Sequence, residues 1–136
     1  AISEMCRVVV PKGLIVLVDT VSPENNAASL WMNDVERRRD PSHRGNLTSL
    51  ELQDAFAESS LEVARKIDTH ISLSLQDWTR RSGSSPSSTA ALLNDFKNAP
   101  KDIVDIFNIE IQGNDALFTW PCAILQAKKP DIKEDK

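Results

Sequence analysis

The sequence contains no tyrosine, and aromatic residues make up only 5% of its 136 positions. Aromatic platforms on which nucleic-acid bases stack are therefore scarce. Acidic residues outnumber basic ones by 20 to 16, and a net charge of −4 argues against a surface that follows phosphates. The one dense basic run, Arg37 to Arg39, is offset by Glu36 and Asp40, which favours an internally paired helix face. We therefore expect no nucleic-acid partner.

Cysteine is equally scarce. Cys6 and Cys122 are too few and too far apart for a disulfide scaffold or a zinc site, and their apolar surroundings predict buried, reduced thiols in a cytoplasmic protein. The longest apolar run, Leu14 to Val18, is far too short to cross a membrane. No basic region followed by an apolar stretch opens the chain. Because it begins at Ala1 rather than methionine, we expect that residues precede it.

The pattern of apolar residues predicts an α/β chain. Leu14 to Val18 is a continuous β-prone run, which predicts a strand buried on both faces, as in a parallel sheet. A half-buried strand is expected over 61–67, in which Arg65 is the misfit. An antiparallel hairpin is expected over 109–127, and Pro121 inside it predicts a bulge or a local edge because proline cannot donate to a ladder.

Helices are predicted between these strands. Thr48 and Glu51 form a capping box at the start of one helix, and Ser74 with Asp77 gives a second capping signal. The stretch 82–88 is rich in serine, glycine and proline and predicts a loop. The remaining expected helices cover 2–10, 28–39 and 88–98, with a last one that starts near Pro100 and carries Phe107.

Several segments resemble one enzyme family. Arg7 to Asp19 resembles the fifth-strand region of class I S-adenosylmethionine-dependent methyltransferases, in which Arg-Val-Leu-Lys-Pro-Gly-Gly precedes an apolar strand that ends near an acid. Glu36 to His43 resembles the Glu-Arg-x-Arg-Asp-Pro-Ser-His element of the branch similar to ubiquinone/menaquinone-biosynthesis methyltransferases. Thr48 to Leu61 and Trp120 to Pro130 are similar to that branch's following helix and strand and to its last strand.

The resemblance implies an incomplete Rossmann-like methyltransferase fold over residues 1–130, followed by a charged tail over 131–136. By this resemblance, the chain would supply strands five, seven and six of the family's seven-stranded sheet, with flanking helices and an antiparallel carboxyl-terminal hairpin. Lys12 and Ser60 replace glycines that are usual in two turns, so we expect these turns to differ in detail. The family binds S-adenosylmethionine through a glycine-rich turn, but the four glycines here are isolated. We expect this chain alone to bind no cofactor.

His43 is the strongest candidate for chemistry. Histidine is the residue type whose ordinary pKa lies nearest neutrality, and Asp40, three residues earlier, could orient His43, so both are candidate catalytic residues. The residues alone favour another explanation, in which Asp40 to His43 simply ends a helix and Asp40 pairs with an arginine. The resemblance adds that this segment forms part of a substrate pocket, with Trp31, Arg39, His43 and Trp120 as the substrate-binding residues.

Two further sets of residues have ordinary explanations. Trp31, Trp78 and Trp120 could line an apolar pocket, but we expect at least one of them to be simply buried in the core. Asp68 and His70 share one face of a strand, at a spacing of two. A metal site would need more ligands than these two, so we expect no metal.

Two classes of function stay open. The chain is either part of a small-molecule methyltransferase without its cofactor-binding half, or a methyltransferase-derived isomerase, cyclase or binding and scaffold partner that uses no cofactor. We do not expect the chain alone to be a competent methyltransferase. Because an apolar edge strand needs cover, we expect a complementary amino-terminal half or a homodimer, with Leu14 to Val18 or the helix over 2–10 at the interface.

Overall fold

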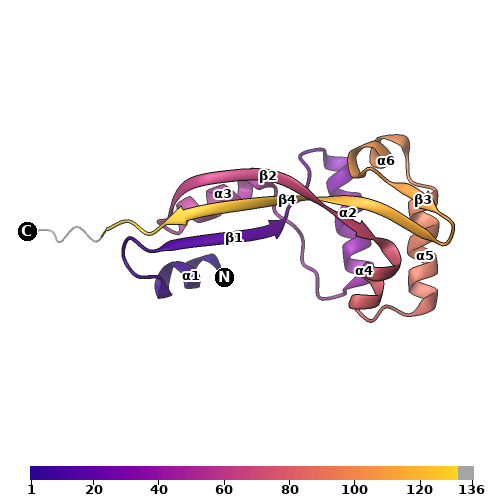
Figure 1. Ribbon diagram of the computed structural model, residues 1–136, viewed down its shortest axis with the longest axis horizontal. Helices are drawn as coiled ribbons and strands as arrows, with labels where there is room; N and C mark the ends of the chain where they lie inside the picture. The colour runs from indigo at the N-terminus through magenta and orange to yellow at the C-terminus, as the bar shows by residue number, and fades with distance from the viewer. Residues whose placement is uncertain (132–136) are drawn as a thin grey trace, which may run out of the picture.

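One long strand, β4 (Asp115–Lys128), organises the fold of the computed structural model, which describes residues 1–131. Every other strand of the sheet pairs with β4 in the antiparallel sense, in the order β1-β4-β2, with β3 pairing to β4 outside this path (Figure 1). The other elements in chain order are α1 (Ile2–Val8), β1 (Leu14–Thr20), α2 (Asn26–Arg39), α3 (Ser49–Glu58), β2 (Glu62–Ser74), α4 (Leu75–Arg81), α5 (Pro86–Lys97), α6 (Lys101–Phe107) and β3 (Glu110–Gln112).

The strand order agrees with the one implied by the family resemblance. β1, β4 and β2 take the places of strands five, seven and six, and β3 with β4 forms the expected carboxyl-terminal hairpin. The hairpin turns at Gly113, which has a φ of +60°. The predicted tail lies outside the described residues from position 132 onward.

The prediction that Leu14 to Val18 is buried on both faces in a parallel sheet is wrong. β1 runs antiparallel to β4, with Leu17 opposite Leu125, and it is an edge strand among the described residues. Leu14, Val16 and Val18 are 57%, 64% and 61% exposed. Ile15 and Leu17, which point to the opposite face, are partly buried against the core beneath α3. The continuous apolar run therefore has only one of its two faces covered.

β4 changes its buried face part-way along its length. The buried side chains are the even-numbered ones from Ala116 to Cys122 and then the odd-numbered ones from Ala123 to Ala127. Successive side chains of a strand point to opposite faces of the sheet. The two ends of β4 therefore pack against different helices on opposite faces. Figure 1 shows α2, α4, α5 and α6 gathered at one end of the sheet, and α1 and α3 at the other.

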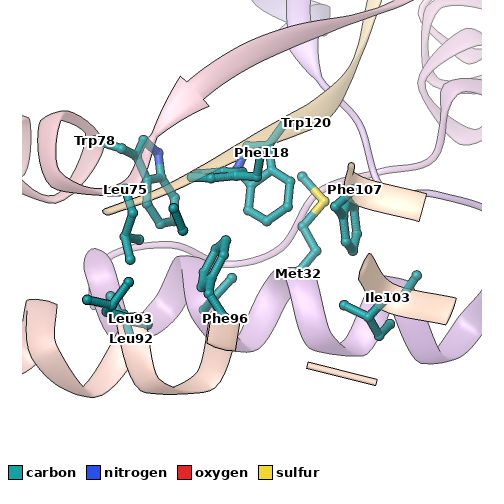
Figure 2. Close-up of a cluster of buried hydrophobic side chains, with 13 residues drawn as sticks. Met32, Leu75, Trp78, Leu92, Leu93, Phe96, Ile103, Phe107, Phe118 and Trp120 are labelled. Atoms are coloured by element: carbon teal, nitrogen blue, oxygen red, sulfur yellow. The ribbon is translucent and has the colours of Figure 1, made fainter. Parts of the chain in front are cut away.

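The larger core is aromatic. Phe118 and Trp120 project from β4 toward side chains of α2, α4, α5 and α6 (Figure 2). The ring centroid of Trp120 lies 4.7 Å from that of Phe118 and 4.8 Å from that of Phe107, both in edge-to-face geometry. Such pairs add about 0.5–1.5 kcal/mol each beyond the burial of their area. The smaller core, on the other face, consists of Val21, Leu52, Phe56, Leu61, Ala123, Leu125 and Ala127.

The helix starts follow their capping residues. The Thr48 side chain accepts from the Glu51 backbone N–H and the Glu51 side chain accepts from the Thr48 N–H, so the predicted capping box is confirmed. Ser74 caps α4 as predicted. The loop predicted over 82–88 is shorter, because Ser85 caps α5 and Pro86 occupies its first turn, where a missing N–H costs nothing.

Four positions depart from regular backbone geometry or strand pairing. Lys12 and Ser60, where the resemblance expects glycine, both adopt left-handed backbone, with φ of 63° and 60°. The register of β2 against β4 shifts between Val63 and Arg65, which explains why Arg65 breaks the predicted alternation. Pro121 lies one residue before Cys122, whose pairing with Thr20 is the last between β4 and β1. No strand on that side needs a backbone N–H from Pro121, which therefore lies at a local edge, as expected.

Among residues 1–131, no helix combines the length and apolar character that crossing a membrane requires. The same residues contain no group of three or more histidine, cysteine, aspartate or glutamate side chains placed to hold a metal ion. The Asp68 side chain instead accepts a hydrogen bond from Ser49 and lies 3.5 Å from the Lys66 amine.

The two faces of the sheet should differ sharply in their contribution to stability. We expect Leu125→Ala to lower the free energy of unfolding by about 2–5 kcal/mol, because it opens a cavity in the smaller core. Val16→Ala, on the exposed face of the adjacent strand, should change it by less than about 0.5 kcal/mol. Urea denaturation followed by circular dichroism measures both, and equal losses would contradict the assignment of faces.

Candidate functional site

The predicted site residues lie in α2, in the loop that follows it, and in β4. α2 ends at Arg39 because the next residue, Asp40, precedes a proline, and residues before proline disfavour helical backbone. The Asp40 side chain accepts hydrogen bonds from the Ser42 backbone N–H at 2.9 Å and from its hydroxyl at 2.7 Å. These bonds lower the pKa of Asp40. Asp40 thus shapes an exposed turn.

His43 is held against α2 by an amide. Its Nε2 lies 3.0 Å from the Asn33 side-chain oxygen, and the same oxygen accepts from the Asn46 backbone N–H at 3.0 Å. The expected orientation of His43 by the Asp40 carboxylate is not observed, because Asp40 contributes only its backbone carbonyl, which accepts from the His43 N–H. A spacing of three within a turn brings backbones together without aligning the side chains.

Arg39 braces α2 against α4. Its Nε donates to the Trp78 carbonyl at 2.9 Å, and its guanidinium lies 4.5 Å from the centroid of the Trp78 ring, a cation–π arrangement. The side chain is 21% exposed, and one terminal nitrogen lies 3.7 Å from Glu36. The Nε donor and the guanidinium face of Arg39 are therefore engaged by the protein itself.

The three tryptophans differ in burial. Trp120 is 1% exposed and Trp78 is 5% exposed, so both are core residues, as expected of at least one tryptophan. Trp31 is only partly buried, and its ring stacks on Phe107 with centroids 5.6 Å apart. Trp120 supports Trp31 from beneath, with centroids 6.3 Å apart in edge-to-face geometry. Of the three, Trp31 presents the most accessible ring.

Sequence reasoning missed Glu36. It was interpreted as a charge offsetting its arginine neighbours, but it is 7% exposed. Burial raises the pKa of Glu36, while the charges of His43 and Arg39 and a hydrogen bond from Trp120 oppose that rise. The Trp120 Nε1 atom is buried and, by strict hydrogen-bond geometry, makes no bond within residues 1–131. We interpret it as close to the Glu36 carboxylate but imperfectly aligned.

A sequence signal for Glu36 did exist. The buried side chains of α2 are Ala28, Met32, Val35 and Glu36, and Glu36 lies four residues after Met32. It therefore shares the apolar stripe of the helix rather than its solvent face. Glu36, Asn33 and His43, together with the Trp120 indole, form one polar cluster between α2, the 40–47 loop and β4.

Two hollows lie away from this cluster. One, of about 850 Å³, opens between α4, the loop over 82–85 and α5, with Gln76, Arg80 and Thr89 in its lining. The other, of about 330 Å³, lies past the end of β1 beside Lys66 and Cys122. None of the predicted site residues lines either hollow.

Known proteins resemble the chain over nearly its whole length. YafE, an uncharacterized protein of Escherichia coli K12, is 26% identical over 129 residues, 95% of the chain and 61% of YafE. YcgJ, an uncharacterized methyltransferase of Bacillus subtilis, is 25% identical over 114 residues, 84% of the chain and 45% of YcgJ. No model of a protein family matches the chain.

Solved structures agree. BH2331 of Bacillus halodurans, classed by inference as a methyltransferase, superposes with a TM-score of 0.87 at 26% identity, covering 95% of the chain and 61% of BH2331. The YcgJ structure superposes with a TM-score of 0.79 at 25% identity, covering 96% of the chain and 56% of YcgJ. The predicted resemblance to methyltransferases is confirmed, and the chain spans at most 61% of these relatives. The ubiquinone/menaquinone-like branch stays a prediction.

Burial of Glu36 predicts a specific pH dependence. Its pKa is higher in the folded than in the unfolded chain, so the folded state binds more protons between the two values. The contribution of Glu36 to stability therefore decreases as pH rises through a window that begins near 4.5, the ordinary pKa of a glutamate carboxyl. Glu36→Gln has no such window, so the variant should gain in relative stability from acid toward neutral pH. Urea denaturation at a series of pH values measures the difference, and a constant difference would contradict the burial of an ionisable group.

Proposed function

Because the chain matches methyltransferases over 95% of its own length, we propose that it is the carboxyl-terminal part of a methyltransferase that acts on a small molecule. The superposition on BH2331, with a TM-score of 0.87, is the observation that carries this proposal. As fold alone does not select a substrate, the acceptor molecule is left as a class. The free thiols Cys6 and Cys122 support a location in the cytoplasm.

S-adenosylmethionine is the methyl donor that the resemblance implies for an intact domain. The residues of this chain do not fit that molecule, because no Gly-x-Gly occurs and the four glycines are isolated. Close approach of backbone to such a cofactor needs glycines after an early strand. The donor site therefore belongs to the part of the relatives that this chain does not cover.

The chain supplies the substrate side of the proposed enzyme. Trp31 offers a partly exposed ring, and His43 offers an imidazole for proton transfer. Trp120 backs Trp31, Arg39 fixes the end of α2, and Asp40 shapes the turn that leads to His43. In this proposal Trp31 and His43 contact the substrate, and the other three residues hold them in place.

The partner proposed for the chain is a complementary amino-terminal part of a methyltransferase. Among the described residues, no helix covers one half of a sheet face. We call this half the uncovered face; it carries Leu14, Val16, Val18, Ile67 and Ile124. The outer edge of β1 is also unpaired there. At least 39% of the length of each relative lies outside the part that the chain covers, which is enough to supply a strand and helices. Without that part, a homodimer through the same surface is the expected substitute.

Titration calorimetry with S-adenosylmethionine tests the assignment of the two halves. We expect no measurable binding by the 136-residue chain, because it lacks the glycine-rich turn. S-adenosylhomocysteine, which shares the nucleoside, is the matched second ligand and should also fail to bind. Micromolar affinity for either would contradict the proposal. Turnover of a substrate without any methyl donor would instead favour the cofactor-free alternative.

A further inference from the structure

The Asn33 side chain determines which ring nitrogen of His43 carries the proton. Its amide nitrogen donates to the Ser29 carbonyl at 2.9 Å, and its oxygen already accepts from the Asn46 backbone N–H. The amide orientation is therefore fixed by two independent bonds. Since the Asn33 oxygen can only accept, the His43 Nε2 atom, 3.0 Å away, must be the donor.

This assignment leaves Nδ1 of neutral His43 with its lone pair. Nδ1 makes no hydrogen bond within residues 1–131 and is not one of the buried unpartnered atoms there, so it is open to solvent. A ring nitrogen in this state is a proton acceptor at neutral pH. The structure thus presents a tautomer whose free nitrogen faces outward and whose other nitrogen is anchored to α2.

A carboxylate lies one turn further along α2. Glu36 is three residues after Asn33, on the same side of the helix; burial raises its pKa, and the positive charge of His43 opposes that rise. Arg39 also faces this carboxylate, with one terminal nitrogen 3.7 Å from it, while its Nε donates to the Trp78 carbonyl. The Trp120 indole approaches Glu36 from β4.

The other acid near His43 is engaged elsewhere. Asp40 accepts two hydrogen bonds from Ser42 in the exposed turn, and its negative charge adds to the rise in the pKa of Glu36 that burial causes. The charged groups around Glu36 are therefore His43 and Asp40 from the loop and Arg39 from α2, with the neutral indole of Trp120 from β4.

We propose that Asn33 and Glu36 are positioning residues for His43: Asn33 holds the tautomer that exposes Nδ1, and Glu36 supports the proton that Nδ1 receives. This rests on the proposed function in so far as it gives His43 a substrate proton to accept. In that step a substrate O–H bond breaks, its electron pair stays on oxygen, and the proton goes to Nδ1. The resulting imidazolium donates from Nε2 to Asn33 and is stabilised by the negative charge of Glu36.

Nitrogen-15 NMR of the two histidines tests the tautomer directly. At neutral pH the His43 Nδ1 signal should have the shift of an unprotonated ring nitrogen and Nε2 that of a protonated one. Asn33→Ala should shift His43 toward a mixture of tautomers, whereas His70, exposed on β2, should not change. A His43 protonated mainly at Nδ1 would overturn the role of Asn33.

The coupling of Glu36 to His43 is tested by carbon-13 titration of the Glu36 carboxyl group. Histidine side chains are positively charged at the acidic pH where carboxyl groups titrate. Removing that charge with His43→Gln should therefore raise the pKa of Glu36 further, since His43 opposes the effect of burial. The Trp120 indole N–H signal should follow the same transition. The matched control is His70→Gln, which should leave the Glu36 titration unchanged.

The possible outcomes separate the proposals. If His43→Gln leaves the pKa of Glu36 unchanged, Glu36 is a structural acid and its positioning role is wrong. If Asp40→Asn changes the His43 ring signals while Glu36→Gln does not, the supporting carboxylate is Asp40 instead. Neither measurement involves methyl transfer, so failure of the proposed function in calorimetry and failure of this cluster are distinguishable.

Discussion

β4 packs Phe118 and Trp120 against α2, α4, α5 and α6, and it packs Leu125 and Ala127 against the core beneath α3, on the opposite face. Both cores depend on one strand that runs through them, and its pairing to β2 is unbroken from Leu117 to Gln126. The change of buried face after Cys122 therefore links two hydrophobic clusters that share no helix. It also determines which halves of the sheet stay uncovered.

The uncovered face follows from this arrangement. Where β4 buries its odd-numbered side chains under α3, its even-numbered ones, such as Ile124, face away beside Val16 and Val18 of β1. An exposed apolar face next to an open strand edge favours association. The chain covers at most 61% of its relatives, and we propose that a complementary part of a methyltransferase covers this face. In the same proposal the methyl-donor site lies in that part and the substrate-binding residues lie in this chain.

Much of the fold could be predicted because it depends on local chemistry. The capping residues Thr48 and Ser74, and the hairpin turn at Gly113, are short-range signals that the structure reproduces. The strand order came from the resemblance rather than from periodicity. The burial of β1 was mispredicted because an apolar run such as Leu14 to Val18 shows what a strand could bury, not which neighbours are present.

The candidate site was harder to predict for a different reason. Spacing placed Asp40 near His43, but a hydrogen bond also depends on the direction in which each side chain points. The Asp40 side chain bonds to Ser42, and the His43 side chain bonds to Asn33. Glu36 was hidden by its charged neighbours, because a run of arginines suggests a solvent face. Only its spacing of four from Met32 indicated burial. The burial of Glu36 depends on the long-range packing of α2 against Trp120 of β4.

Amide hydrogen exchange along β1 tests most directly whether the chain is a part that needs a complement. Antiparallel pairing to β4 engages alternate amides of an edge strand and leaves the others pointing outward. At a concentration where light scattering shows a monomer, amides from Leu14 to Asp19 should alternate between slow and fast exchange. Association, with a second copy or with an amino-terminal methyltransferase part, should slow the fast set. Uniformly slow exchange across β1 in the monomer would mean that the edge is already covered, and would contradict the proposed need for a complementary half.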